Sequence, residues 1–183
     1  MKIKYLKYLF LPIMVLVIGI TASCERDDIC PESTPTTPSL IITAFDVDEQ
    51  DNKKNIFGLR IQGVGIDKVL TGYNVVTNDS IVLPLKTHIN TSQYKIHSNY
   101  TYDDNDTPDD TSDDIIGGNQ DIVTISYTTE NVFVSRACGY KTIFKAVEIV
   151  VENDGDNWIQ SIQPLNNPQS VENETAVHFN LFH

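Results

Sequence analysis

The residues best suited to chemistry in this sequence are three cysteines. Cys24 and Cys30 lie six positions apart in the stretch TASCERDDICPE, and Cys138 follows in SRACGYK. Thiols at these positions suggest acylation, disulfide formation or metal binding. The spacing of Cys24 and Cys30 matches no zinc pattern, and a site made of cysteines alone would have too few ligands. We therefore expect separate roles for Cys24 and for the other two cysteines.

The residues before Cys24 have the three parts of a secretory signal peptide. Residues 1–8 carry three lysines and no acid, residues 9–20 form an apolar run of 12, and three small residues follow. This run is shorter than the roughly 20 residues of a membrane-spanning helix, and Pro12 also disfavours a helix. We predict that residues 1–23 form a lipoprotein signal peptide and not a permanent membrane helix.

Thr21-Ala22-Ser23-Cys24 resembles a bacterial lipobox, in which small residues precede a cysteine. The lipobox thiol is alkylated by diacylglycerol, and the new N-terminus is commonly acylated after cleavage. Two or three acyl chains hold a protein firmly on a membrane, whereas one chain gives only reversible binding. Thr21 stands where most lipoboxes have leucine. We predict lipidation of Cys24, with ordinary cleavage beside a free cysteine as the alternative.

The acidic stretch after this cysteine bears on location. Residues 25–28, Glu-Arg-Asp-Asp, resemble short export signals that direct some Bacteroidota lipoproteins to the outer leaflet of the outer membrane. A solvated tether between lipid and domain explains the same residues. We expect an outer-membrane lipoprotein of the cell envelope, either on the periplasmic face or at the cell surface.

Cys30 and Cys138 are the thiols that remain once Cys24 is lipidated. An exported chain with an even number of remaining cysteines suggests a disulfide. Such a bridge closes a loop of about 108 residues, worth on the order of 4–5 kcal/mol in the chain-entropy model. The alternative is two separate buried thiols.

Composition excludes some partners. The net charge is −12, and it becomes −15 without residues 1–23, which carry three lysines and no acid. So acidic a chain lacks the basic patches that bind nucleic acid, and anionic lipid headgroups repel it overall. About 160 mature residues are the size of a single domain.

The chain divides into a tether at 24–39, with the proline-rich spacer PESTPTTPS, and a single domain at 40–183. Short β-branched and aromatic stretches without a helical period predict an all-β fold, an antiparallel β-sandwich or a partly open β-barrel. Residues 142–150 are the one helical rival, and their valines and isoleucines favour a strand. The expected strands are 40–45, 55–65, 80–85, 93–102, 121–127, 131–138, 145–152, 157–165 and 175–182.

Local patterns refine this expectation. Alternation in QYKIHSNYTY places Tyr94, Ile96, Tyr100 and Tyr102 on one face of a strand. The strands 121–127 and 131–138 are expected to form a hairpin around the short turn Thr-Thr-Glu. Asn-Asp-Gly-Asp at 153–156 is a strong turn signal.

The acidic loop DDNDTPDDTSDD, residues 103–114, has seven aspartates in twelve positions. Clustered carboxylates supply the oxygen ligands that calcium needs, so Asp104, Asp106, Asp109 and Asp110 are weak calcium candidates. The glycine and the final glutamate of an EF-hand loop are missing. We favour a solvated acidic insert between two strands, and no bound cofactor.

No catalytic motif stands out. The four histidines lack a partner motif, and His97 and His178 are expected on the polar faces of their strands. A pair of acids brought together in space, as in glycosidases, stays open. Arg136, beside Cys138, offers an ion pair or a carboxylate-binding group, and Gly139 suggests a tight bend. We favour a structural, disulfide-stapled corner there and expect no enzyme.

Several motifs together resemble a family of small, uncharacterised Bacteroidota lipoproteins. The resemblance implies a lipoprotein in which Cys30 and Cys138 belong to the family pattern, and it implies no activity. The motifs are C-x-R-D-D-I-C-P at 24–31, T-P-T-T-P-x-L-I-I at 34–42, D-S-I-x-L-P-L at 79–85, S-R-A-C-G-Y-K at 135–141 and N-E-x-A-V-H-F at 173–179.

The expected function is therefore that of a non-enzymatic accessory lipoprotein. It would be held by the lipid on Cys24 and bind another envelope protein, with no role for nucleic acid. A second hypothesis is a calcium- or small-ligand-binding surface module that uses residues 103–114 or a pocket near Arg136. The third is an unrecognised hydrolase.

Overall fold

A computed structural model describes residues 29–183. The predicted signal peptide 1–23 and the lipidation residue Cys24 lie outside the described residues, so both stay predictions. The described chain forms two compact units, one of residues 29–34 and 133–140 and one of residues 35–132 and 141–183. The domain boundaries expected from the sequence also stay a prediction.

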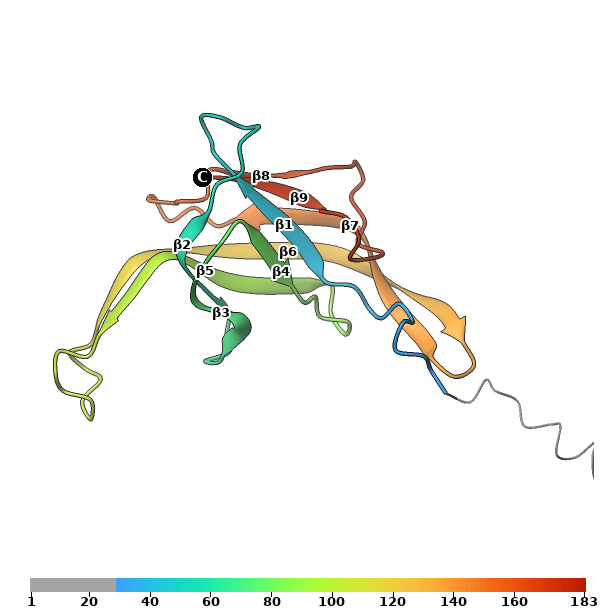
Figure 1. Cartoon of the computed structure of the whole chain (residues 1–183), viewed down its shortest axis with the longest axis horizontal. Coiled ribbons are helices and arrows are strands. Elements are labelled where there is room, and N and C mark those ends of the chain that lie inside the picture. Colours follow the sequence, from blue (N-terminus) through green and yellow to red (C-terminus); the bar gives the residue numbers. More distant parts are fainter. Residues whose placement is uncertain (1–28) are drawn as a thin grey trace, which may run out of the picture. The chain divides into compact units, whose positions relative to one another are not determined.

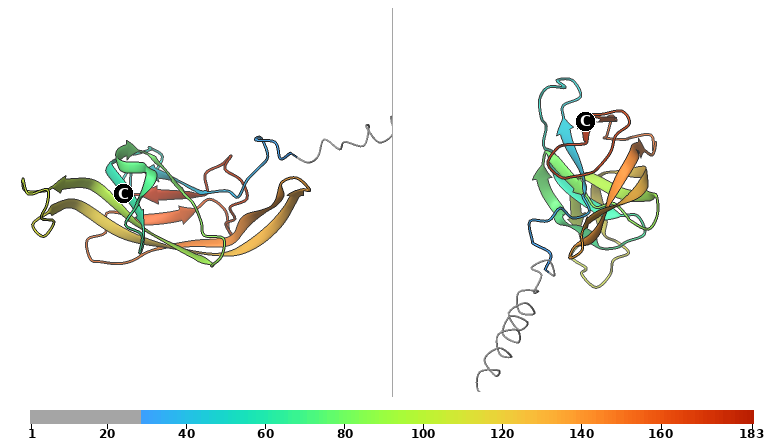
Figure 2. Two further views of the ribbon diagram at one scale, coloured as in Figure 1. Left: turned by 90° about the horizontal axis from the view of Figure 1, so that it is seen from below. Right: turned by 90° about the vertical axis from the view of Figure 1, so that its right-hand side faces the viewer.

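The larger unit is built from two β-sheets, as Figures 1 and 2 show. This confirms the all-β fold class. The part of the chain from 29 to 183 contains no helix, and hence none able to cross a membrane. One sheet has the order β4 (Ser80–Leu83), β1 (Leu40–Phe45), β9 (Phe179–Phe182) and β8 (Ser161–Pro164). The other has the order β3 (Val69–Asn78), β2 (Ile56–Gly63), β5 (Thr91–Asp103), β6 (Ile115–Ser135) and β7 (Gly139–Val151).

The first and last strands meet at the centre of the four-stranded sheet. β1 pairs antiparallel with β4, as Ile42 opposite Ile81, and parallel with β9, as Ile42 opposite Phe179. β9 therefore lies beside β1, although the two are far apart in the sequence. This parallel pair departs from the otherwise antiparallel arrangement of the paired strands described here.

The hydrophobic core takes side chains from both sheets. Successive side chains of a strand point to opposite faces, so a strand with one face on the core buries alternate residues. In β6, for example, Val123, Ile125 and Tyr127 are buried as the sequence predicts. The core members with no exposed surface include Leu40, Ile42, Leu59, Ile61, Ile81, Leu83, Ile96, Val123, Ile125, Phe144 and Leu181.

The hairpin predicted around residues 128–130 is wrong. β6 runs without a break from Ile115 to Ser135, and the turn comes afterwards, at residues 136–138. Thr-Thr-Glu contains no residue suited to positive φ, and threonine favours extended backbone. Gly139, at φ +70°, accepts the left-handed conformation that follows the turn. The tight bend expected at Gly139 is thus confirmed.

Two other strand features differ from expectation. β3 was not predicted, because it is an edge strand in which only Tyr73 is buried and the apolar signal is weak. In β5 the alternation breaks between Ser98 and Thr101, where the register with β6 shifts. As a result Tyr102 is 54% exposed instead of sharing the buried face of Tyr94. The strand expected at 142–150 is confirmed within β7.

Candidate functional site

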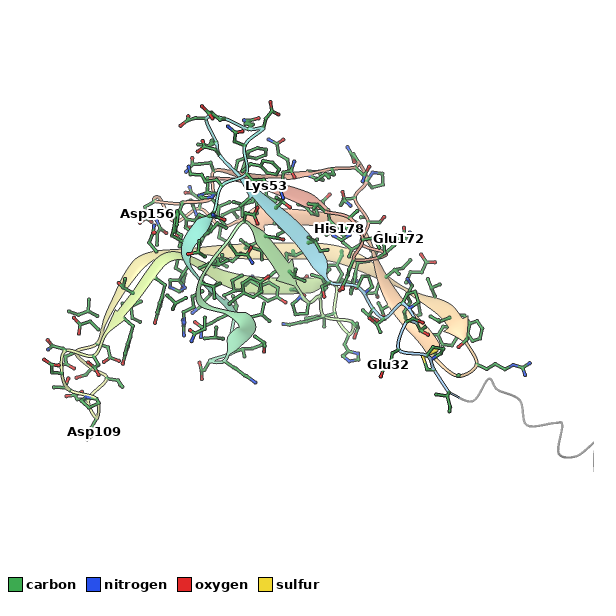
Figure 3. The ribbon with its side chains drawn as sticks, in the orientation of Figure 1. Glu32, Lys53, Asp109, Asp156, Glu172 and His178 are labelled. Atoms are coloured by element: carbon green, nitrogen blue, oxygen red, sulfur yellow. A yellow bond between two sulfur atoms is a disulfide. The ribbon has the colours of Figure 1, made fainter. Side chains whose placement is uncertain are left out.

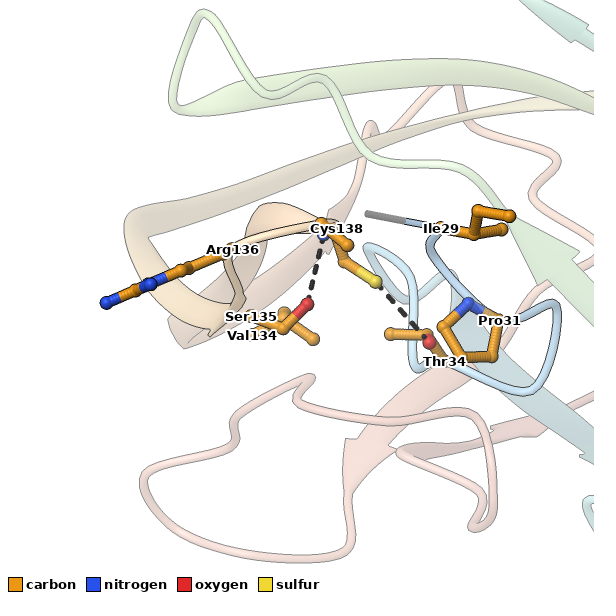
Figure 4. A pocket seen from close by; sticks show the side chains of 8 residues that line it. Ile29, Pro31, Thr34, Val134, Ser135, Arg136 and Cys138 are labelled. Carbon is orange, nitrogen blue, oxygen red and sulfur yellow. Dashed lines mark hydrogen bonds between the residues drawn. The ribbon is translucent and has the colours of Figure 1, made fainter. Parts of the chain in front are cut away.

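The disulfide predicted between Cys30 and Cys138 is present, with Cα atoms 4.9 Å apart. We call the unit that it closes, residues 29–34 and 133–140, the disulfide tip. Within it the Cys138 N–H donates to Ser135 Oγ at 3.0 Å, which stabilises the turn before Gly139. Thr34 Oγ1 lies 3.5 Å from Cys138 Sγ (Figure 4). The bridge therefore joins the segment that begins at Ile29 to the end of the β6–β7 hairpin.

A cavity of about 550 Å³ lies within the disulfide tip. Ile29, Pro31, Val134 and Ala137 supply apolar walls. The charged end of Arg136, also a lining residue, points away from Cys138 and Thr34 in Figure 4. Neither an ion pair nor a hydrogen bond of the Arg136 side chain occurs among residues 29–183. The ion pair expected for Arg136 is therefore not formed within the described chain.

Three large apolar side chains of the disulfide tip face outward. Ile29 is 81% exposed, Phe133 56% and Tyr140 69%. The rings of Phe133 and Tyr140 meet edge to face, with centroids 5.4 Å apart. Edge-to-face aromatic pairs are a preferred packing geometry. Here the pair forms an exposed apolar surface.

A second exposed surface lies in the larger unit, on the end of the β5–β6 hairpin. Beyond the bulge the strands pair as Thr101 with Gly117 and Tyr102 with Ile116. This two-stranded end, residues 101–117, is the β5–β6 ribbon, and it extends past the neighbouring strands in Figures 1 and 2. Ile115 is 59% exposed and Ile116 61%. Adjacent strand residues point to opposite faces, so each face of the ribbon carries an exposed isoleucine.

The acidic loop closes the ribbon, as expected for an insert between two strands. Figure 3 shows Asp109 at its far end. The aspartates accept hydrogen bonds within the loop: Asp104 from the Asp106 N–H, and Asp113 from Thr107 Oγ1 at 2.8 Å. Hydrogen bonds from Asn105 and Thr107 hold the pKa of Asp113 below its ordinary value.

The four calcium candidates do not converge. Asp104 and Asp110 accept hydrogen bonds from backbone N–H groups of the loop, and hydrogen bonds from the Ser112 side chain and N–H lower the pKa of Asp110. Among residues 29–183 no three His, Cys, Asp or Glu side chains are grouped as metal ligands would be. The geometry therefore offers calcium no assembled site in the described chain.

The expected positions of two histidines are wrong. His178 is 5% exposed and His97 8%, so neither lies on a solvent-facing surface. The Ile41 N–H donates to His178 Nδ1 at 3.0 Å, and His178 Nε2 lies 3.1 Å from the Asn173 carbonyl oxygen, to which it donates. Burial lowers the pKa of both histidines. His178 thus satisfies two backbone groups, whereas His97 packs edge to face against Tyr100, and its buried Nδ1 has no hydrogen-bond partner among residues 29–183.

Sequence reasoning also missed a buried acid, Asp121. Its carboxylate accepts the Ile159 N–H at 2.9 Å and fastens the segment before β8 to β6. The side chain is fully buried, and burial raises the pKa of this carboxyl. Alternation along 121–127 places Asp121 on the core face, which is the signal that would have found it.

A groove of about 340 Å³ opens between two strand edges of the larger unit. It is lined by residues 146–150 of β7, by Ile162 and Pro164 of β8, and by residues 166–169. Its walls are mostly apolar, and it holds Glu148 as its one charged lining residue. The groove combines no nucleophile with a base.

Comparison with known proteins places the chain in a family. No curated protein and no solved structure matches it. Residues 58–183 match the family described as Family of unknown function (DUF6452), and this covers more than half of the chain. The match confirms the resemblance to an uncharacterised family, while the Bacteroidota lipoprotein class stays a prediction. The chain is thus a member of this family of unknown function, DUF6452.

Proposed function

We propose that this protein is a lipid-anchored component of the cell envelope. In this proposal its β-domain is a non-enzymatic interaction module of an outer-membrane complex. The Cys30–Cys138 bridge supports export, because disulfides persist in oxidising compartments and are rare in the cytosol. The signal-like residues 1–23 and the lipobox ending at Cys24 support anchoring by acyl chains.

The main support for an interaction role is the exposed apolar surface of the β5–β6 ribbon. A two-stranded hairpin on its own is marginally stable in water, and this one exposes Tyr102, Ile115 and Ile116. Tyr102 pairs with Ile116, so these two side chains share one face of the ribbon, and an exposed apolar surface is one mark of a protein-binding site. Binding of a partner to the ribbon would bury these side chains and add the support that a free two-stranded end lacks.

The charge of the ribbon defines the partner. Residues 103–114 carry seven aspartates and no lysine or arginine. Carboxylates near an apolar contact favour a partner with basic residues around an apolar groove, and they repel acidic surfaces. The proposed partner is therefore another envelope protein with a positively charged rim.

The test is affinity capture of the tagged full-length protein from its native envelope after cross-linking in cells. Capture is expected to yield one stoichiometric partner that is lost in a Cys24→Ala strain. Ile116→Ser is expected to reduce capture by about fivefold or more, since core contacts dominate interface energy. Ile89→Ser is the matched control, because Ile89 is also exposed, at 51%, and lies outside the ribbon.

Two outcomes would contradict the proposal. Equal capture by the Ile116→Ser and Ile89→Ser variants would remove the ribbon as the interface. No partner above background from any variant would reject the accessory role. A thermal unfolding midpoint that rises with added calcium in wild type, but not after Asp104→Asn and Asp106→Asn, would instead favour the calcium-binding hypothesis.

A further inference from the structure

We infer that the disulfide tip lies in the interfacial layer of the bilayer that anchors the chain, with Ile29, Phe133 and Tyr140 as its contact residues and Arg136 on the lipid phosphates. This inference deepens the proposed function and rests on lipidation of Cys24. It assigns the exposed end of the β6–β7 hairpin to a lipid surface and not to a protein partner.

The length of chain between anchor and tip supports this assignment. Ile29 is five positions after Cys24, and five residues span at most about 18 Å when fully extended. The sulfur of a lipidated Cys24 carries a diacylglycerol, so it is held at the membrane surface. The polar layer on each side of the hydrocarbon core is itself several ångströms thick. Ile29 is therefore confined close to the headgroups.

The disulfide extends this confinement to the hairpin. Cys30 is next to Ile29, and its bridge to Cys138 keeps the two Cα atoms 4.9 Å apart. Phe133 and Tyr140 belong to the same unit as Cys30. The bridge thus prevents the hairpin end from separating from the tether, and the apolar side chains stay near the bilayer.

The exposed side chains have the chemistry of a membrane interface. Tyrosine is enriched at the headgroup level, where its apolar ring and its hydroxyl are both accommodated, and phenylalanine supplies apolar surface that enters the interface. Phe133 and Tyr140 are 56% and 69% exposed, and Ile29 is 81% exposed. Transfer of these side chains from water into the interface removes apolar surface that nothing else in the described chain covers.

Charge also distinguishes the tip from the rest of the molecule. Residues 29–34 and 133–140 contain one acid, Glu32, and one base, Arg136, whereas the whole chain carries −12. The net charge of the tip is therefore zero, so anionic headgroups do not repel it as they repel the acidic protein as a whole. The Arg136 guanidinium has no carboxylate partner among residues 29–183, and it can bind a lipid phosphate through two parallel hydrogen bonds.

The experiment uses tryptophan as a depth probe in the lipidated full-length protein. Phe133→Trp and, as the matched control, Phe57→Trp are purified from the envelope and reconstituted in phosphatidylcholine vesicles. Both phenylalanines are exposed, and Phe57 lies on β2 in the larger unit. Quenching by lipids brominated on the acyl chains is corrected for the native Trp158 with wild-type protein. Mass spectrometry reports the acyl chains on Cys24.

The new tryptophan of Phe133→Trp is expected to be quenched roughly twofold or more relative to that of Phe57→Trp, since an interfacial side chain reaches the acyl boundary. The tryptophan of Tyr140→Trp is expected to be quenched like that of Phe133→Trp. Agreement between the two variants shows that the result does not come from misfolding of one of them. Equal quenching of the Phe133→Trp and Phe57→Trp variants in lipidated form overturns the membrane contact and leaves the lipid anchor intact. Absence of acyl chains on Cys24 overturns both proposals, because nothing then brings the tip to the bilayer.

Discussion

At the scale of single residues, the buried histidines set the response to pH. His178 is neutral in the fold, because Nδ1 must stay unprotonated to accept the Ile41 N–H. Burial is the main cause that lowers the pKa of His178, and likewise of His97 and His183. The unfolded chain takes up these protons near its ordinary pKa of about 6.5, and the folded chain only at lower pH. The contribution of these histidines to stability is therefore full above that value and is lost as pH decreases toward the folded pKa values.

His178→Leu tests this response. The variant leaves the Ile41 N–H without its acceptor, so the free energy of unfolding at pH 7 is expected to fall by about 1–3 kcal/mol. The loss of stability between pH 7 and pH 5 is expected to be shallower than in wild type, because one of the buried histidines is gone. Urea unfolding followed by circular dichroism at several pH values measures both effects.

His88→Leu is the control for His178→Leu, because His88 is exposed. It is expected to keep the wild-type stability at pH 7. A His178→Leu protein with a wild-type slope between pH 7 and pH 5 would show that this histidine does not contribute to the pH response.

At the scale of elements, the β5–β6 ribbon depends on close backbone contact at its bulge. Gly118 has φ +93°, and a Cβ there would lie 2.5 Å from the Ser98 carbonyl oxygen and 2.6 Å from that of Asn99. Asn99 itself has φ +51°, a conformation that asparagine tolerates better than most residues. The bulge is thus built from a glycine and an asparagine facing each other across the pair. It marks where the core-backed sheet ends and the free ribbon begins.

Gly118→Ala tests the importance of this contact against Gly155→Ala. Gly155 has a similar φ, +97°, but open space around its missing Cβ. Both variants suffer backbone strain of about 1–3 kcal/mol, and Gly118→Ala is expected to lose on the order of 2 kcal/mol more because its Cβ meets backbone oxygens. Denaturant unfolding of the two variants measures the difference. Equal losses of unfolding free energy in the two variants would show that the bulge accommodates the added Cβ of Gly118→Ala without a further energetic cost.

At the scale of the whole molecule, the disulfide links two distant parts of the chain. Cys30 and Cys138 are separated by 108 positions, and the bridge restricts the unfolded chain over that whole length. It also holds the segment around Cys30, which follows the predicted anchor residue Cys24, against the end of the β6–β7 hairpin. The proposed membrane contact depends on this one covalent bond, which also supports the proposed export.

The Cys30→Ser variant is expected to lower the free energy of unfolding by on the order of 4 kcal/mol. Cys138→Ser and the double variant are expected to lose the same amount, because either change removes the whole bridge. Cys24→Ser is the control and is expected to unfold like wild type in detergent. The comparison is made by urea unfolding under oxidising conditions. Full wild-type stability in the double variant would contradict a stabilising role for the bridge.

The sequence by itself determined the features that depend on local pattern. Alternating apolar residues in 121–127 and 145–152 were sufficient to predict two strands and the face that each one buries. The reason is that side chains on successive strand residues point to opposite sides. Asn-Asp-Gly-Asp at 153–156 identified its turn, because glycine accepts positive φ, here +97° at Gly155. With Cys24 assigned to the predicted lipid anchor, the even number of remaining cysteines predicted the bridge between Cys30 and Cys138 that the structure contains.

Only the tertiary structure decided which distant residues meet. Three contacts join residues that are far apart in the chain. β1 pairs in parallel with β9, the Ile41 N–H donates to buried His178, and the Ile159 N–H donates to Asp121. No local pattern encodes such contacts, because they arise when two sheets bury one shared core and every buried polar group must then find a partner. The same reason explains why Phe133, which was expected in an ordinary strand, lies on a surface that this core leaves uncovered, as do Tyr140, Ile115 and Ile116 outside the expected strands.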